Sequence, residues 1–207
     1  PNTNYGNAAV AQIKRDNGTN FTRKTYLGFD LSTLPAGSLT NASLSFEFVD
    51  SAAGTTGVAT NWGFELFGLT DQALDGWSES TITWNNAPAN NTSNTNLPAQ
   101  VDLTKATSLA TFNRTGKGLG PVTIANANLL NFLLADNNDL ASFILVRTTN
   151  ALSGQNYVHA IATSENTTAA GKPTLTIPVV PAPAPLALVA IGLLALGAAK
   201  RNRCKPS

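Results

Sequence analysis

Short runs of alternating apolar and polar residues dominate the first 180 residues. In residues 43–49, Leu44, Phe46 and Phe48 alternate with polar neighbours, which is the pattern of a half-buried β-strand. Similar runs predict further strands at residues 9–15, 21–31, 63–69, 81–84, 142–148, 158–163 and 174–179. We therefore predict an all-β fold, an antiparallel jelly-roll β-sandwich.

One segment breaks the period of two. Residues 126–135 place Ala127, Leu130, Leu133 and Leu134 on one face of a helix, and Asn126 is a suitable N-cap residue. The sandwich is therefore expected to carry one short helix.

The composition changes at residue 181 and divides the chain into a body, residues 1–180, and a tail, residues 181–207. Pro181, Pro183 and Pro185 alternate with alanine and predict a stiff, extended stretch that does not continue a sheet. Residues 186–199 are free of charge and predict a hydrophobic tail helix, followed by a basic cluster of Lys200, Arg201 and Arg203. A full membrane span needs roughly 20 apolar residues, so a buried C-terminal helix is the alternative.

This ordered series resembles the PEP-CTERM sorting signal, with Pro-Ala-Pro in place of the usual Pro-Glu-Pro. The resemblance implies recognition and cleavage by an exosortase-like enzyme in a Gram-negative bacterium. It further implies export, a transient association with the inner membrane, and a final place at the cell surface or in the extracellular matrix. Methionine is absent, so we expect that a segment preceding Pro1 has been removed.

The composition favours a non-enzymatic protein. Hydrophobic residues make up 43 % of the chain, enough for a core, whereas charged residues make up only 12 %. The body is net acidic because four of the 13 basic residues lie in the tail, so we expect no nucleic-acid partner. His159 is the only histidine and Cys204 the only cysteine, which leaves no parts for a nucleophile–base pair or a transition-metal site.

Four basic residues, Lys14, Arg15, Arg23 and Lys24, flank a single turn at residues 16–20. If the flanking strands pair, all four side chains gather at one end of a hairpin. Arginine grips carboxylates with two hydrogen bonds and lysine adds a point charge, which suits uronic-acid or sulfated sugars. The alternative is that these charges protect an exposed strand edge from pairing with other chains.

Three tryptophans and three acids are further candidates. Trp62 follows a polar run and is a candidate for sugar stacking at an exposed loop end, although a strand-start residue that packs inward is the alternative. Trp77 and Trp84 are expected to anchor a loop on the core, with ligand stacking as the alternative. Asp71, Asp75 and Glu79 are candidate ligands of a structural calcium ion or, alternatively, solvated loop acids.

Several motifs follow one another along the body. They are Asn-Tyr-Gly at residues 4–6, Tyr-Leu-Gly-Phe-Asp-Leu-Ser at 26–32, Asn-Ala-Ser-Leu at 41–44, Trp-x-Glu-x-x-x-Thr-Trp-x-x-x-Pro at 77–88, Ser-Glu at 164–165 and Lys-Pro-Thr-Leu-Thr-Ile at 172–177. This series resembles the DNRLRE domain, also described as carbohydrate-binding module family 96. The resemblance implies a jelly roll without catalytic residues that binds extracellular polysaccharide, in some members acidic polysaccharide through basic strand residues. The rival interpretation is a structural or adhesive protein that assembles through its β edges.

Overall fold

The structure, a computed structural model of the 207-residue chain, describes residues 2–16, 21–34, 37–54, 61–93, 100–150, 157–168 and 171–181. Its strands are β1 (Val10–Ile13), β2 (Thr25–Asp30), β3 (Gly37–Leu39), β4 (Ser43–Val49), β5 (Asn61–Leu69), β6 (Ala106–Thr115), β7 (Gly120–Ile124), β8 (Leu140–Arg147), β9 (His159–Ala162), β10 (Thr174–Thr176) and β11 (Val179–Pro181). The helices are η1 (Gln72–Leu74), a 3-10 turn, and α1 (Ala127–Leu134).

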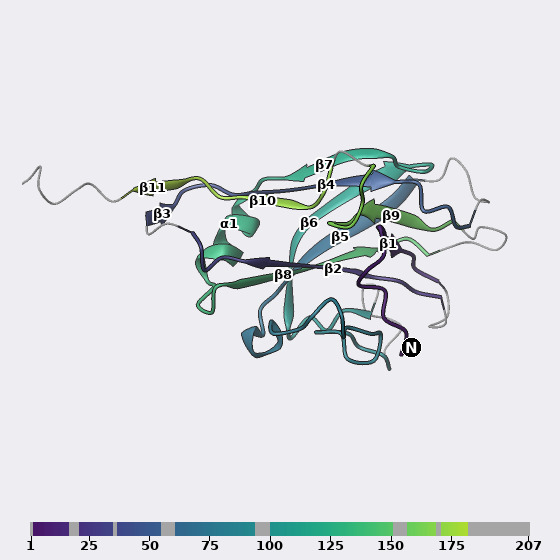
Figure 1. The fold of residues 1–207 in the computed structure, drawn as a ribbon, viewed down its shortest axis with the longest axis horizontal. Helices are drawn as coiled ribbons and strands as arrows, with labels where there is room; N and C mark the ends of the chain where they lie inside the picture. Colours follow the sequence, from purple (N-terminus) through teal and green to yellow (C-terminus); the bar gives the residue numbers. More distant parts are fainter. Residues whose placement is uncertain are drawn as a thin grey trace, which may run out of the picture.

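The strands form a sandwich of two antiparallel sheets (Figure 1). The four-stranded sheet has the order β2-β8-β5-β6, and in the five-stranded sheet β1, β9 and β4 are neighbours while β7 and β10 also pair with β4. A small two-stranded sheet of β3 and β11 extends one end. The chain crosses between the two large sheets from β1 to β2 and again from β6 to β7. At each edge of the four-stranded sheet, the edge strand is therefore connected directly to a strand of the other sheet.

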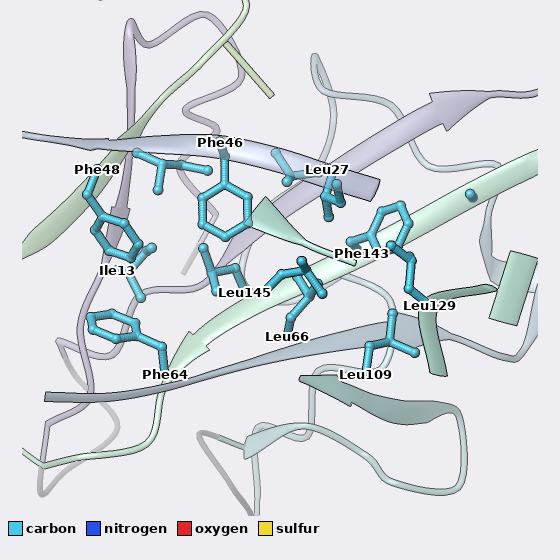
Figure 2. Packing of buried hydrophobic residues seen from close by; sticks show 14 of the residues in the cluster. Ile13, Leu27, Phe46, Phe48, Phe64, Leu66, Leu109, Leu129, Phe143 and Leu145 are labelled. Atoms are coloured by element: carbon cyan, nitrogen blue, oxygen red, sulfur yellow. The ribbon is translucent and has the colours of Figure 1, made fainter. Parts of the chain in front are cut away.

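The main core lies between the two large sheets (Figure 2). Phe46 and Phe48 of β4 point from one sheet toward Phe64 and Leu66 of β5 in the other, and all four are buried. Full burial of one such side chain stabilises a fold by about 1.5–3 kcal/mol. This aromatic and aliphatic layer makes the sandwich a rigid support for what lies outside it.

The strand predicted at residues 43–49 is confirmed as β4, with alternating buried and half-buried residues. The short helix is also confirmed: the Asn126 side chain accepts a hydrogen bond from the Leu129 amide at 2.9 Å and caps α1. The predicted apolar face is wrong, however. Leu129 and Leu133 are buried, whereas Leu134 is exposed. The helix face that contacts β6 is therefore the one that carries Leu129 and Leu133.

Other strands differ from those that the hydrophobic pattern predicted. Residues 81–84 form turns rather than a strand, and β6 and β7 were not predicted because their exposed polar positions hide the alternation. Val179–Pro181 pairs with β3, so the expected boundary between residues 180 and 181 falls inside β11. A proline is tolerated at the end of an edge strand, where its missing N–H leaves no partner unsatisfied.

The outer face of the four-stranded sheet is covered by a further layer, residues 70–93 and 100–105, which we call the covering segment (Figure 1). Leu74, Ala89 and Val101 of this segment pack on Phe67 and Ile144 of the sheet and form a second apolar cluster. The sheet is thus buried on both faces, which explains why every residue of β8 from Ala141 to Arg147 is buried.

No helix in the described part of the chain is long and apolar enough to cross a membrane. The predicted tail helix at residues 186–199 and the sorting-signal residues Pro183, Pro185, Lys200, Arg201 and Arg203 lie outside the described residues.

Candidate functional site

Outward-facing residues of β2 hold the covering segment in place. Side chains alternate across a strand, so Tyr26 and Gly28 face outward on the same side. The Tyr26 hydroxyl donates to the Pro88 carbonyl at 3.0 Å, and its ring meets Trp77 edge-on with centroids 6.0 Å apart. A Cβ on Gly28 would lie 3.2 Å from the Trp77 ring, so glycine lets the indole rest directly over the strand.

Lys24, just before β2, fastens the next turn of the covering segment. Its ammonium donates to Asn90 Oδ1 at 2.5 Å and to the Gln100 carbonyl at 2.7 Å, and it lies 5.1 Å from the centroid of the Trp84 ring. Asn90 in turn donates to the Trp84 carbonyl. Burial lowers the pKa of Lys24 to about 7. Lys24 is therefore an internal anchor of this layer.

The N-terminal residues clamp the same segment from the other side. Asn4 donates through its side-chain amide to the carbonyls of Glu79 and Ile82, at 2.7 and 2.6 Å. Gly6 lies against the Glu79 main chain. The Trp-x-Glu motif is thus fixed between β2 and the chain's first residues.

A pocket of about 220 Å³ opens beside Trp77. The indole N–H of Trp77 donates to Ser142 Oγ at 2.8 Å, which orients the half-buried ring at the pocket wall. The pocket is lined by Gly28, Phe29 and Asp30 of β2, by Leu140, Ala141 and Ser142 of β8, and by Asp75, Trp77 and Glu79 of the covering segment.

Asp75 is the buried acid of this pocket, with only 6 % of its surface exposed. Burial raises the pKa of the Asp75 carboxyl, although hydrogen bonds with Ser142 and Asn138 oppose the shift. Its Oδ1 has no hydrogen-bond partner among the described residues. A buried acceptor without a partner disfavours the charged form of this carboxyl, in line with its raised pKa.

A second hollow of about 290 Å³ adjoins the first at Trp77, which lines both. Its other lining residues come from the covering segment: Ala73, Leu74, Gly76, Thr81, Ile82, Asn86 and Pro88. The two hollows make Trp77 the centre of an open, mixed polar and apolar surface on the outside of the sandwich.

The family model of carbohydrate-binding module family 96 matches residues 1–107, just over half of the chain. The chain belongs to this family. The matched range ends within β6 and includes Asn4, Gly6, β2 and the covering segment, so it contains most of the residues that build and line the pocket. No curated protein matches the chain.

Among solved structures, the family 96 module is similar to latent aurone synthase (polyphenol oxidase). The recombinantly expressed enzyme matches with a TM-score of 0.37 and 12 % identity over 77 % of this chain and 25 % of that one. The enzyme from its natural source matches with a TM-score of 0.35 and 12 % identity over 82 % of this chain and 26 % of that one. The module spans about a quarter of the length of these structures. With similarity this low, its properties must be derived from its own residues.

The basic quartet does not converge on one surface. Lys24 is held inside the covering segment, Arg15 donates to the Thr148 carbonyl at 2.6 Å, and Lys14 is buried with its ammonium 5.5 Å from the Phe21 ring centroid. Lys14 and Arg23 pair through their main chains, as a hairpin requires, but β1 and β2 then enter different sheets. The four residues therefore flank one hairpin turn as predicted, but the side chains of Lys14, Arg15 and Lys24 go to different contacts because the hairpin spans the two layers of the sandwich.

Trp62 is not a surface residue, and its prediction as a sugar contact is corrected. It is fully buried on β5, on the same side as Phe64 and Leu66. The Arg147 guanidinium lies 4.4 Å from its ring centroid, and the His159 ring lies 5.5 Å away. The alternation Trp62, Phe64, Leu66 carried the signal that the ring points inward.

His159 belongs to this buried cluster and is neutral. Arg147 Nη1, which can only donate, lies 3.3 Å from Nδ1, so the Nε2 hydrogen is directed at the Gly116 carbonyl at 3.2 Å. Burial, together with the Arg147 charge, lowers the pKa of His159 to about 4. The expected packing role of this histidine fits its surroundings of Phe64 and Tyr157.

The predicted calcium ligands are not brought together. Within the described residues, no group of three or more histidine, cysteine, aspartate or glutamate side chains could hold a metal ion. Asp75 and Glu79 line the pocket, but Asp71 does not. Asp71 lies one 3-10 turn before Asp75 and is close enough to raise the pKa of Asp75, but its side chain does not line the pocket.

Sequence reasoning missed Gly28, Asp30 and Ser142 as pocket residues. Gly28 left a signal, since a glycine inside a strand marks the close approach of another group. Asp30 and Ser142 left none, because their neighbourhood with Asp75 arises only from the pairing of β2 with β8 beneath the covering segment.

Proposed function

We propose that this family 96 module is a non-catalytic protein that binds extracellular polysaccharide at the surface around Trp77. The observation that carries the proposal is the half-buried indole, oriented by Ser142 and bordered by two open hollows. An aromatic ring offers an apolar face to a sugar, and neighbouring polar groups set its orientation. The rigid sheet below preserves this geometry.

The chemistry of the chain supports a binding role without catalysis. The single histidine is buried and neutral within the aromatic core, so it is not placed to act as a general base on a bound substrate. Acidic residues do line the Trp77 pocket, but glycosidase chemistry requires two carboxyl groups placed on opposite sides of a scissile bond. The pocket is a shallow surface hollow suited to the edge or end of a chain.

An anionic polysaccharide is the partner that the basic quartet predicts, and Arg23 keeps a half-exposed side chain at this end of the hairpin. Binding of an anionic polysaccharide to the basic quartet would depend on a few surface charges and would weaken steeply with added salt. Binding at Trp77 would respond weakly to salt, because it depends on stacking and hydrogen bonds. Salt dependence therefore separates the two surfaces.

The proposal is tested by affinity electrophoresis of the full chain through neutral, aminated and acidic polysaccharides. Gly76 lies at the edge of the second hollow, and a Cβ there would meet nothing within 4 Å, so Gly76→Tyr should fill the hollow without disturbing the fold. We expect retardation by at least one polysaccharide, reduced in Gly76→Tyr and unchanged in Thr111→Tyr, an exposed position on β6. Absence of retardation by every polysaccharide would refute the proposed function.

The jelly roll is also part of the proposal. The sheet orders β2-β8-β5-β6 and β1-β9-β4-β7, with consecutive strands crossing between sheets, support it. Export, exosortase-like cleavage and a final place at the surface or in the matrix of a Gram-negative bacterium are proposed from the tail sequence alone. Transient inner-membrane association would precede cleavage.

Assembly through β edges is the second candidate function. The observation that favours it is the length of β6, a ten-residue strand at the edge of the four-stranded sheet. A long strand at a sheet edge offers main-chain groups for pairing with another chain, although the Leu109 carbonyl of β6 already accepts from the Asn126 side chain. Sedimentation velocity over a range of concentrations would reveal self-association, and an Ala110→Pro substitution on β6 would abolish it if this edge is used.

A further inference from the structure

The second hollow, which adjoins the first at Trp77, is uncharged and largely apolar. The described residues that line it are Ala73, Leu74, Gly76, Trp77, Thr81, Ile82, Asn86 and Pro88. None of them is charged, and Leu74, Trp77 and Ile82 are half-buried, so part of each apolar side chain stays open to the hollow. The ligand is therefore selected here by polar groups or by apolar contact, and not by charge.

The polar groups of the loop beside the hollow are engaged with one another. The Asn86 side chain accepts from the Thr83 amide at 2.6 Å and donates to the Thr81 carbonyl at 3.0 Å. The amides of Thr81 and Ile82 both donate to the Ser78 carbonyl, at 3.1 and 2.9 Å. These groups build the loop itself, so they are not the ones that a ligand would use.

The wall opposite this loop presents carbon atoms. The indole N–H of Trp77 donates to Ser142 Oγ at 2.8 Å, and Ser142 lines the first pocket, not the second hollow. The Pro88 carbonyl accepts from the Tyr26 hydroxyl. What Trp77 and Pro88 offer to the second hollow is therefore ring carbon.

A surface of this kind favours an apolar substituent of a sugar over its hydroxyl groups. A hydroxyl group that enters gives up hydrogen bonds to water and finds polar groups that are already engaged. A methyl group gives up none, and its burial strengthens binding about fourfold. An acetyl group carries such a methyl beyond the sugar ring, and about 290 Å³ holds the acetyl group with the ring edge that bears it.

We propose that the second hollow is a subsite for the acetyl group of an O-acetylated or N-acetylated polysaccharide, with Trp77 and Ile82 against its methyl. The inference rests on the proposed polysaccharide-binding function and gives it a substrate class, acetylated glycans. Because the hollow is uncharged, acidic and neutral backbones both qualify.

The test measures binding of the full chain by isothermal titration to matched pairs of ligands. Acetylated glucomannan and acetylated alginate are each compared with the same polymer after mild alkali has removed the acetyl groups. The N-acetylglucosamine hexamer is compared with cellohexaose, which carries a hydroxyl group in place of each acetamido group. Within a pair the backbone is shared and only the acetyl-bearing group differs.

Two variants change the hollow without touching its charge. Ile82→Thr keeps the β-branch but replaces carbon surface by a hydroxyl group, and Ala73→Gln adds an amide at an exposed lining position. Leu119→Thr, at an exposed leucine outside the hollow, is the matched control. Thermal unfolding of each variant shows that folding is retained.

We expect the wild-type chain to bind at least one acetylated ligand about fourfold or more tightly than its matched counterpart. Ile82→Thr and Ala73→Gln should bring this ratio toward one, and Leu119→Thr should leave it unchanged. A preference within the glucomannan or alginate pair identifies the O-acetyl group, and a preference within the hexamer pair identifies the N-acetyl group.

Two results would overturn the inference while leaving polysaccharide binding in place. One is equal affinity of the wild-type chain for the acetylated and matched ligands of every pair. The other is a preference for acetylated ligands that Ile82→Thr and Ala73→Gln both retain in full, since acetyl recognition would then lie elsewhere. Absence of binding to every ligand would instead refute the proposed function itself, and the inference with it.

Discussion

Gly6 passes so close to Glu79 that a Cβ on residue 6 would lie 2.0 Å from the Glu79 carbonyl oxygen. Asn4 secures the contact by donating to the carbonyls of Glu79 and Ile82. The Asn-Tyr-Gly element and the Trp-x-Glu motif are therefore two halves of one structural unit. This unit positions Trp77 and Glu79 at the pocket, and it lies within the range matched by the family.

Substitution of Gly6 tests the close approach directly. Gly6→Ala would force the main chains of residues 6 and 79 apart and should lower the free energy of unfolding by about 1–3 kcal/mol. Gly76→Ala is the matched control, because its Cβ would meet nothing within 4 Å. Urea denaturation of both variants measures the difference, and equal stability of the two would contradict the contact.

The Asn4 side chain holds Gly6 as well as the covering segment, because its Oδ1 accepts from the Gly6 amide at 3.1 Å. Asn4→Ala removes two hydrogen bonds to main-chain carbonyls, so we expect a loss of about 1–3 kcal/mol in the free energy of unfolding. Asn2→Ala removes one exposed hydrogen bond, from Asn85, and should cost less than about 0.5 kcal/mol. Thermal denaturation under identical buffer conditions compares them; a loss as large in Asn2→Ala as in Asn4→Ala would show that the clamp has no special role.

Lys24 and Arg23 are adjacent in sequence but should differ in effect. Lys24→Ala deprives Asn90 and Gln100 of a donor and uncovers Trp84, which should lower the free energy of unfolding by about 2–4 kcal/mol. Arg23→Ala should leave stability within about 0.5 kcal/mol of wild type. Guanidinium denaturation measures both, and a stable Lys24→Ala protein would argue that Lys24 is free to bind a ligand after all.

His159 should make the fold sensitive to mild acid. Its folded pKa of about 4 lies below the unfolded value of 6.5, so the unfolded state binds more protons between these values. Stability should fall as the pH drops from 6.5 toward 4, by about 3 kcal/mol in total. In His159→Gln, which cannot titrate, the free energy of unfolding should stay nearly constant between pH 6.5 and 5. A wild type equally insensitive over that range would refute a neutral, buried histidine.

The tail predicts processing in the native organism. The mature protein should lack the residues beyond about Pro185 and should be found outside the inner membrane. Mass spectrometry of the secreted and surface fractions identifies the C-terminus. Retention of Arg201 and Arg203 in the mature chain would contradict the sorting interpretation.

Local patterns sufficed where a residue's environment depends on its own strand or turn. The alternation of Leu44, Phe46 and Phe48 predicted β4, and Asn126 predicted the start of α1, because period and capping are properties of neighbouring residues. The motif series likewise indicated the family, because its resemblance to the family is carried by short stretches of neighbouring residues.

The site depended on contacts between distant segments, which no local pattern encodes. Lys24 reads as a surface charge until Asn90, Gln100 and Trp84 enclose it. Asp75 became a buried acceptor only when the covering segment folded over β8. The sequence by itself determined most of the strands, the position of the helix and the family; tertiary packing alone decided which polar groups are desolvated and which remain open to a ligand, because burial is a property of the whole fold.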